Sequence, residues 1–262
     1  KPSAQAKANV WNSDVDYGSE ANWPTLPERL EDAGIAWRIY QNELSLDTGL
    51  GSEEESWLAN FTDNPIEWFT QYQVRFSSTF RSNLPQREQE LTRTVAELEA
   101  IAQRSPAQDK KLRTSRAQLA EARQHLATYT EANYAKLDAR TRNLHEKAFT
   151  TNAGDPNYRK LTTLTYRDGN TERRMQVPKG DVLHQFRADV RDGKLPAVSW
   201  VVAPERFSDH PGSPWYGAWY LSEVLDILTQ NPKVWQKTVF ILCYDENDGL
   251  FDHIPPFVPP LP

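Results

Sequence analysis

The strongest constraint on the fold is a strand, helix, strand pattern in the last third of the chain. An apolar strand is predicted over 195–204 (LPAVSWVVAP), an amphipathic helix over 215–232 and a second apolar strand over 238–248 (TVFILCYDEND). Two strands that are joined through a helix pair in parallel, with a right-handed crossover, because antiparallel neighbours need only a short turn. The pattern therefore predicts an α/β fold with a mostly parallel sheet flanked by helices.

The N-terminal region adds a second helix and strand step. The segment WPTLPERLEDAG has helical spacing and ends at Gly34, and IAWRIYQ follows as a strand candidate. Residues 45–82 carry many aromatic side chains without a sustained period, and only WFTQYQVRF is typical of a short helix. Nine tryptophans and eighteen prolines in 262 residues indicate long ordered loops rather than disorder.

A region rich in Gln, Glu, Arg, Ala and Leu runs from Gln86 to about Lys147. Its apolar residues are spaced for one helical stripe, and Ser105-Pro106 favours a break, so we predict a long helical-hairpin insertion. The domain organisation is then a catalytic α/β domain in two parts, 1–82 and 148–262, with a helical insertion over 83–147. The insertion is interpreted as a solvated structural element, with a partner-binding coiled coil as the alternative.

Two shorter patterns follow the insertion. Asp168-Gly169 predicts the turn of a β-hairpin, and Gly180-Asp181 opens a helix that stops at Gly193. His184 lies on an apolar side of that helix and is interpreted as a packed structural residue. His125 and His145 have no carboxylate or thiolate cluster at ligand spacing and are predicted to lie on the surface.

Acidic residues and histidines follow both strands of the C-terminal pattern. The first strand leads into APERFSDHPGSP and the second into YDENDGLFDHIPP. Ligands of open α/β sheets bind beyond the carboxyl ends of the strands, so these two loops are expected to converge on one site.

The acids after the second strand are candidate metal ligands. Asp245 and Glu246 offer hard oxygen ligands from a fixed strand end, and their mutual repulsion favours a bound cation. Asn247 adds a neutral ligand or a hydrogen bond, while a reversal at Gly249 brings Asp252 and His253 back towards the same cavity. The alternative is an ordinary solvated turn.

His210 is the candidate catalytic histidine. Asp209 beside it and the rigid PGSP after it would hold the imidazole for donating a proton to a leaving oxygen or for stabilising a phosphoryl group. A loop anchor on the surface is the alternative. The aromatic residues that follow are candidates for holding a quaternary ammonium, but core packing is favoured for at least one of them: Trp215, Tyr216 and Trp219.

Charge and hydropathy exclude two classes of protein. A net charge of -6 lacks the basic footprint of nucleic-acid binding, so no nucleic-acid partner is expected. No apolar run approaches the ~20 residues that a transmembrane helix needs. The single cysteine, Cys243, excludes an internal disulfide framework.

Three segments carry a family resemblance that spans nearly the whole chain and is weakest in the helical hairpin. WPTLPERLEDAGIAWRIYQNE, VPKGDVLHQFRADVRDGKLPAVSWVVAPERFSDHPGSP and KTVFILCYDENDGLFDHIPP closely resemble the phosphocholine-specific bacterial phospholipases C. These belong to a phosphoesterase family that includes acid phosphatases and is similar, more distantly, to alkaline-phosphatase-type enzymes.

The resemblance implies hydrolysis of phosphatidylcholine, and of sphingomyelin as a further candidate, to a lipid alcohol and phosphocholine through a metal-assisted phosphoenzyme. By motif, Asp245 and Glu246 correspond to metal-binding acids, with Asp245 also in a catalytic role, and His210 to the histidine that assists phosphoryl transfer. Asp209, Asn247, Asp252 and His253 are placed at the periphery of the site. The divalent metal is open among Ca²⁺, Mg²⁺, Mn²⁺, Fe and Zn²⁺.

One departure from the family is expected to matter. The asparagine-rich N-terminal motif and the hydroxyl nucleophile have no counterpart here, and the chain begins without methionine. We therefore expect an internal fragment that is inactive alone, with the nucleophile unassigned.

The resemblance also implies a periplasmic or secreted bacterial enzyme with peripheral membrane contact and a choline phospholipid substrate. An acid phosphatase of the same broad family is the first alternative, and an inactive scaffold or interaction module is the second.

Overall fold

The computed structural model describes residues 17–208 and 213–244. The first elements are α1 (Leu26–Asp32), β1 (Trp37–Tyr40), α2 (Ser52–Leu58) and three short 3-10 helices, η3 (Pro65–Trp68), η4 (Thr70–Tyr72) and η5 (Val74–Phe76). Then come α3 (Ser78–Glu99), α4 (Pro106–Thr128), α5 (Glu131–Tyr134), α6 (Ala139–Ala148), β2 (Leu161–Asp168) and β3 (Thr171–Pro178). The last are α7 (His184–Arg191), β4 (Val198–Val201), η6 (Glu205–Phe207), α8 (Pro214–Thr229) and α9 (Pro232–Trp235).

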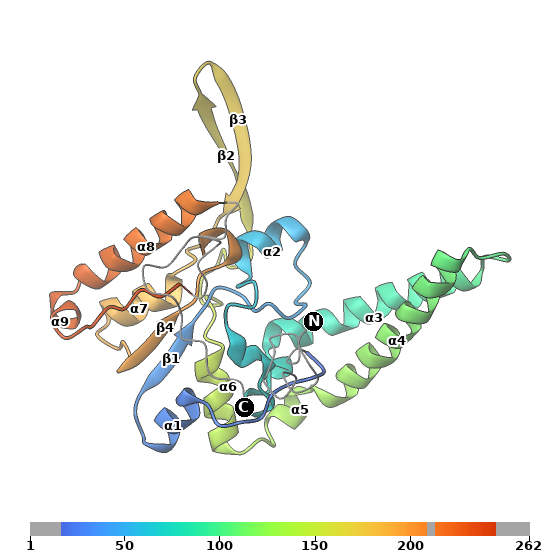
Figure 1. Cartoon of the computed structure of the whole chain (residues 1–262), viewed down its shortest axis with the longest axis horizontal. Coiled ribbons are helices and arrows are strands. Elements are labelled where there is room, and N and C mark those ends of the chain that lie inside the picture. The colour runs from blue at the N-terminus through green and yellow to red at the C-terminus, as the bar shows by residue number, and fades with distance from the viewer. Residues whose placement is uncertain (1–16, 209–212, 245–262) are drawn as a thin grey trace, which may run out of the picture.

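A parallel strand pair, β1 with β4, lies at the centre of the α/β region (Figure 1). Its register runs from Trp37 opposite Val198 to Tyr40 opposite Val201. The helix before it, α1, begins with a capping box between Thr25 and Glu28. The structure thus confirms the predicted order of a helix followed by a strand in the N-terminal region.

The β1–β4 pair separates two apolar clusters. Trp37 and Ile39 belong to the cluster that includes Tyr72 and Leu144, whereas Tyr40 belongs to the cluster that includes Phe186 and Val224. Successive side chains of a strand point to opposite faces, so this short sheet is buried on both sides.

The prediction of a mostly parallel sheet is not confirmed. The described strands form one parallel pair and one antiparallel hairpin, β2 with β3. The strand predicted over 238–248 is wrong for its described part, because 238–244 contains no strand and exposes Ile241 (73%) and Leu242 (50%). An apolar run becomes a strand only where a neighbour accepts its hydrogen bonds, and β4 pairs with β1 instead.

The predicted helical hairpin is confirmed, and Figure 1 shows α3 and α4 projecting side by side from the body of the molecule. Ser105 caps α4 by accepting a hydrogen bond from Gln108 N, with Pro106 at the first helical position. The seam buries Leu98, Leu112, Leu119 and Ala122. The helix α3 begins earlier than predicted and runs through Pro85, because Phe80 and Leu84 extend its buried stripe.

The prediction for His145 is wrong. Its side chain is buried, with the residue 7% exposed, and Nδ1 lies 3.0 Å from the Tyr72 backbone oxygen. His145 is buried because α6 packs onto η4. The charged residues that follow His145 in the sequence gave no sign of this packing. His125 is half-buried against the rings of Phe80 and Tyr129 rather than on the open surface.

The predicted β-hairpin turn at Asp168-Gly169 is confirmed, and the ribbon projects from the body of the molecule (Figure 1). Gly169 has a φ of +59°, which residues other than glycine adopt at a cost. The predicted helix stop at Gly193 is also confirmed, with a φ of +65° after α7.

Candidate active-site edge of the parallel sheet

Two segments leave the carboxyl ends of the parallel strands side by side: the one after β1 begins at Gln41, and the one after β4 runs from Val202 into η6. Val202 N donates to Tyr40 O over 2.8 Å, which continues the strand pairing to the edge. Glu205 N donates to Ala59 O over 2.9 Å and so attaches the loop after β4 to the end of α2. This is the edge at which ligands of α/β sheets bind.

Several polar side chains are buried together beside this edge. The Gln41 Oε1 accepts from Asn60 Nδ2 at 3.2 Å and from Asn64 Nδ2 at 2.7 Å, and Asn60 Nδ2 also donates to Glu67 Oε1 at 2.7 Å. Burial raises the pKa of Glu67, although hydrogen bonds from Tyr17 and Asn60 oppose the rise. Gln41 Nε2 has no hydrogen-bond partner among the described residues.

Glu43 is the fully buried carboxylate of the edge. Tyr158 donates its hydroxyl to Glu43 Oε2 at 2.8 Å, Leu44 N donates to Oε1 at 2.8 Å, and Arg159 Nη1 lies 3.2 Å from Oε2. Burial raises the pKa of Glu43, and these donors oppose the rise. Because its oxygens already have partners, Glu43 supports the loop rather than offering a free carboxylate to a ligand.

A second buried bridge connects β1 to α7. Asn152 Nδ2 donates to Asn42 Oδ1 at 2.9 Å and to Val182 O at 2.6 Å, while Asn152 Oδ1 accepts from Gln185 N at 3.0 Å. Asn42 Nδ2 donates to Leu58 O at 3.0 Å. Asn42 is thereby hydrogen-bonded both to Asn152 and to the end of α2, which fixes the segment that follows β1.

The residues just before the predicted histidine loop are firmly anchored. Phe207 is 7% exposed and packs against the rings of Trp57 and Tyr220. Arg206 stacks on Trp57, with its guanidinium carbon 4.6 Å from the ring centroid, and its Nε donates to Ser56 Oγ at 2.9 Å. The helix α2 therefore holds the end of η6 in place.

Core packing is confirmed for one of the three aromatic residues that follow. The Tyr216 ring lies 5.2 Å from that of Trp57, whereas Trp215 is 85% exposed and Trp219 is 48% exposed.

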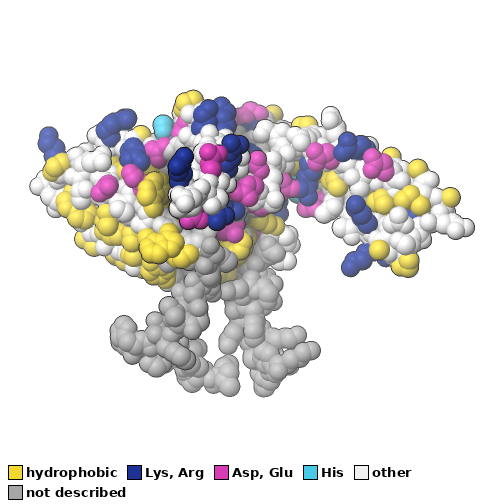
Figure 2. Space-filling model, turned by 90° about the horizontal axis from the view of Figure 1, so that it is seen from above, with side chains coloured by type: hydrophobic (Ala, Val, Ile, Leu, Met, Phe, Trp, Pro, Cys, Tyr) yellow, Lys and Arg dark blue, Asp and Glu magenta, His cyan; other side chains and the backbone are white. Residues whose placement is uncertain are grey.

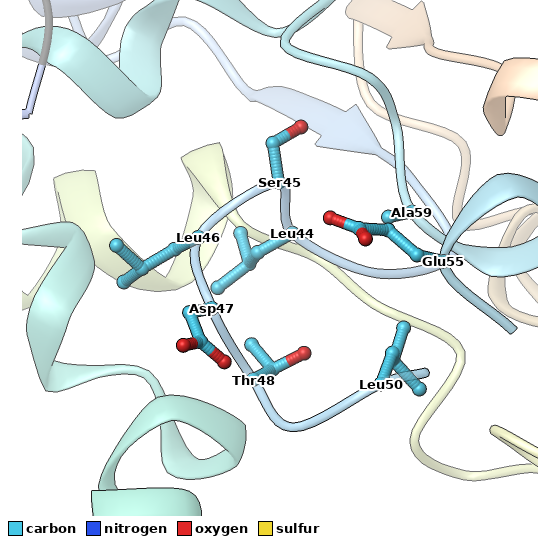
Figure 3. Close-up of a pocket in the computed structure, with 8 residues that line it drawn as sticks. All are labelled: Leu44, Ser45, Leu46, Asp47, Thr48, Leu50, Glu55 and Ala59. Atoms are coloured by element: carbon cyan, nitrogen blue, oxygen red, sulfur yellow. The ribbon is translucent and has the colours of Figure 1, made fainter. Parts of the chain in front are cut away.

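A hollow of about 320 Å³ opens beside the loop after β1 (Figure 3). Figure 3 shows the carboxylates of Asp47 and Glu55 at its rim, from that loop and from α2. Asp47 is already engaged, since Oδ1 accepts from Asn83 Nδ2 at 3.2 Å and Oδ2 pairs with Arg87. The full lining is Leu44, Ser45, Leu46, Asp47, Thr48, Leu50, Glu55 and Ala59.

Comparison with known proteins identifies the family. The model of the phosphoesterase family matches residues 3–103 and 96–262. The chain belongs to the phosphoesterase family. It is 32% identical over 257 residues to a non-hemolytic phospholipase C of Burkholderia pseudomallei, across 95% of this chain and 23% of that protein.

Two further relatives of this phosphoesterase come from Pseudomonas aeruginosa. A non-hemolytic phospholipase C is 31% identical over 253 residues, which is 95% of this chain and 21% of the relative. A hemolytic phospholipase C is 46% identical over 95 residues, which is 36% of this chain and 13% of the relative. The chain thus spans less than a quarter of the length of these relatives.

The predicted site residues of the phosphoesterase lie outside the described residues. Asp209 and His210 follow Ser208 directly, and Asp245 follows Tyr244. The same holds for the rest of the second loop: Glu246, Asn247, Asp252 and His253. Within 17–208 and 213–244, no three His, Cys, Asp or Glu side chains are close enough to hold a metal ion. The predicted roles therefore stay predictions.

Sequence reasoning assigned no role to the buried polar network of the edge. One signal was present, because Gln41, Asn42 and Glu43 directly follow an apolar strand. Asn60, Asn64 and Glu67 gave no such signal, since they lie in a region without periodicity and meet the strand end only in three dimensions.

Proposed function

We propose that this chain forms part of the catalytic domain of a phospholipase C that hydrolyses phosphatidylcholine, and also sphingomyelin, to phosphocholine and a lipid alcohol. The observation that carries the proposal is the β1–β4 edge. There the anchored residues Glu205–Phe207 lead directly into the loop of Asp209 and His210. The names of relatives that align with 95% of the chain support phospholipase C activity, while the choline lipids as substrates rest on the sequence resemblance.

The proposed chemistry is phosphoryl transfer in two steps. An enzyme hydroxyl gives up its proton and attacks phosphorus, and the bond from phosphorus to the lipid oxygen breaks as His210 supplies the proton that the lipid alcohol carries away. Water then attacks the phosphoenzyme and gives a proton to His210, and phosphocholine leaves as the enzyme hydroxyl regains its proton. No residue of this chain is assigned as the nucleophile.

Anchoring of η6 gives the proposal a physical basis. A general acid must be held within hydrogen-bond reach of the leaving oxygen, and misplacement by about 1 Å can cost ~100-fold in rate. Phe207 and Arg206 are packed on Trp57, three and four residues before His210, so the start of the loop has a fixed position.

A divalent metal ion is proposed as the cofactor, with Asp245 and Glu246 as its ligands. Carboxylates supply the hard oxygen donors that Ca²⁺, Mg²⁺ and Mn²⁺ prefer, and a bound cation would offset the repulsion between adjacent acids. When bound, such an ion stabilises negative charge on the phosphoryl oxygens.

A bacterial periplasmic or secreted location is proposed together with this substrate, because phosphatidylcholine resides in membranes. Among the helices of residues 17–208 and 213–244, none combines the length and the hydropathy of a transmembrane span. Contact with the membrane would be peripheral.

A substrate panel tests the proposal. The full-length protein that contains this chain is given phosphatidylcholine, sphingomyelin and p-nitrophenyl phosphate, and release of phosphocholine or p-nitrophenol is measured. We expect phosphocholine release to dominate. Cleavage of p-nitrophenyl phosphate alone would identify an acid phosphatase, and no cleavage of any substrate would contradict a phosphoesterase role.

A further inference from the structure

The β2–β3 ribbon projects from the body of the molecule with most of its surface in contact with solvent. Along β2 every residue after Leu161 is exposed, and only three residues of β3 are half-buried. Strands of eight residues give the ribbon a length of about 25 Å. A two-stranded ribbon of this length gains little stability in water from its own contacts. A partner that buried its exposed side chains would therefore stabilise it, and the surface is open to one.

The pairing register divides the ribbon into an apolar and a polar face. Leu164 lies opposite Met175, Thr162 opposite Val177 and Tyr166 opposite Arg173, and residues that oppose each other share a face. We call Leu164, Tyr166, Met175 and Val177 the apolar hairpin face. The other face carries polar side chains, among them Thr163, Thr165, Arg174 and Gln176.

The base of the apolar hairpin face is fixed to the body, and its outer part is bare. Val177 and Met175 pack against the apolar cluster of α7 and α8, and the Tyr216 hydroxyl lies 3.6 Å from Met175 Sδ. Further out, Leu164 is 47% exposed and Tyr166 is 43% exposed. The face is therefore held at a set angle to the body while its outer half lacks cover.

The charge of the ribbon is opposite to that of the chain. Residues 160–179 contain five basic and two acidic side chains, a net charge of +3, whereas the whole chain carries -6. Figure 2 looks down on this end of the molecule and shows Lys and Arg side chains in dark blue among magenta acids. Arg173 pairs with Asp168 at 3.0 Å and Arg174 with Glu172 at 3.2 Å, which leaves Lys160, Arg167 and Lys179 as the excess.

A phospholipid surface fits this combination. Tyrosine is enriched at the boundary between lipid and water, where its ring is buried and its hydroxyl stays hydrated. Leucine supplies apolar area for shallow burial, and lysine and arginine are attracted to anionic head groups. The net positive charge of the ribbon favours an anionic surface over a neutral apolar protein partner.

We propose that the outer part of the apolar hairpin face, Leu164 and Tyr166, docks this phosphoesterase on the surface of a phospholipid membrane. Arg167 near the tip of the ribbon, together with Lys160 and Lys179 at its base, adds attraction to lipid phosphates. At the base of the ribbon, Met175 contacts Tyr216 of α8, the helix that follows the predicted His210 loop, and the neighbouring Trp215 is exposed. The biological role of this docking rests on the proposed phospholipase activity. The binding test does not depend on that activity.

The test is co-sedimentation of the full-length protein with vesicles of phosphatidylcholine, with and without phosphatidylglycerol. The variant is Leu164→Ser with Tyr166→Ser, and the matched control is Thr163→Ser with Thr165→Ser on the polar face of the same strand. We expect the variant to bind about tenfold more weakly than the wild type, because apolar burial is lost, and the control to bind normally. Phosphatidylglycerol should strengthen binding, and salt should weaken it.

Two readouts separate docking from other causes. Circular dichroism and the melting temperature check that the exposed substitutions leave the fold intact, and p-nitrophenylphosphorylcholine reports activity on a dissolved substrate. Normal turnover of that substrate with reduced turnover of vesicles supports docking. If the wild type hydrolysed no choline ester, the proposed phospholipase activity would be contradicted. The docking proposal would be unaffected, because vesicle binding is measured separately.

Two results would overturn the docking proposal. The first is equal vesicle binding by wild type, variant and control. The second is a dimer in size-exclusion chromatography that the variant, but not the control, dissociates, because a second copy of the chain would then cover the face.

Discussion

The Arg206 guanidinium lies over the Trp57 ring, with its carbon 4.6 Å from the ring centroid. The same side chain donates from Nε to Ser56 Oγ at 2.9 Å. These contacts join the helix α2 to the last residues before the predicted His210 loop, and they explain how a loop that leaves a short strand acquires a fixed starting position.

Arg206→Ala is expected to lower catalytic turnover more than it lowers stability. Loss of the stacking contact costs about 0.5–2 kcal/mol, which a folded domain tolerates, but the loop before His210 loses its anchor. Phosphocholine release and thermal melting measure the two effects. Arg191→Ala is the matched control, because the side chain of Arg191 is exposed and pairs with the neighbouring Asp192. Equal activity of the two variants would contradict a role for the anchor.

Glu43→Ala is expected to destabilise the protein by about 3 kcal/mol, because it leaves Arg159 without its buried partner. Glu43→Gln should cost less, since its single amide oxygen can still accept one of the two hydrogen bonds, from Tyr158 or from Leu44 N. Denaturant unfolding gives both values. Glu97→Ala, at an exposed position of α3, should stay within about 0.5 kcal/mol of the wild type. A loss no larger than that of the control would show that the buried pair contributes little.

His145 is expected to contribute a loss of stability as the pH drops below about 6.5. Burial lowers the pKa of His145 in the folded protein, so the unfolded chain binds the proton more readily in that range. The stability that neutral His145 contributes is fully present above the pKa of histidine in the unfolded chain. It is lost as the pH falls through the lower pKa that His145 has in the folded protein.

The comparison for His145 is the free energy of unfolding of wild type and His145→Gln at neutral and mildly acidic pH. The variant should show a shallower dependence on pH. It keeps some slope, because burial also lowers the pKa of His125. Identical slopes for the two proteins would contradict the buried, neutral state of His145.

Local patterns predicted the elements of this fold better than their arrangement. The α1 helix, the break at Ser105-Pro106 and the turn at Asp168-Gly169 depend on residues close in sequence, and the structure confirms them. The pairing of β1 with β4 depends on a partner more than a hundred residues away, which hydrophobic periodicity does not encode.

The same limit applies to the candidate site. The sheet edge was predicted from the strand before APERF, and β4 confirms that strand. Its buried lining was not predicted, because Asn60, Glu67 and Asn152 reach the edge from separate loops. The proposed catalytic residues His210 and Asp245 stay predictions from sequence and family resemblance.

The most direct measurement is phosphocholine release from phosphatidylcholine by the full-length protein, with His210→Asn and Asp245→Asn beside the wild type. Asp192→Asn at the end of α7 and His125→Gln in the helical hairpin are matched controls away from the carboxyl edge of the sheet. We predict that both site variants lose about 100-fold or more of the activity at unchanged melting temperature, while the controls retain it. Full activity in either site variant would contradict the placement of the active site at the carboxyl edge of the parallel strands.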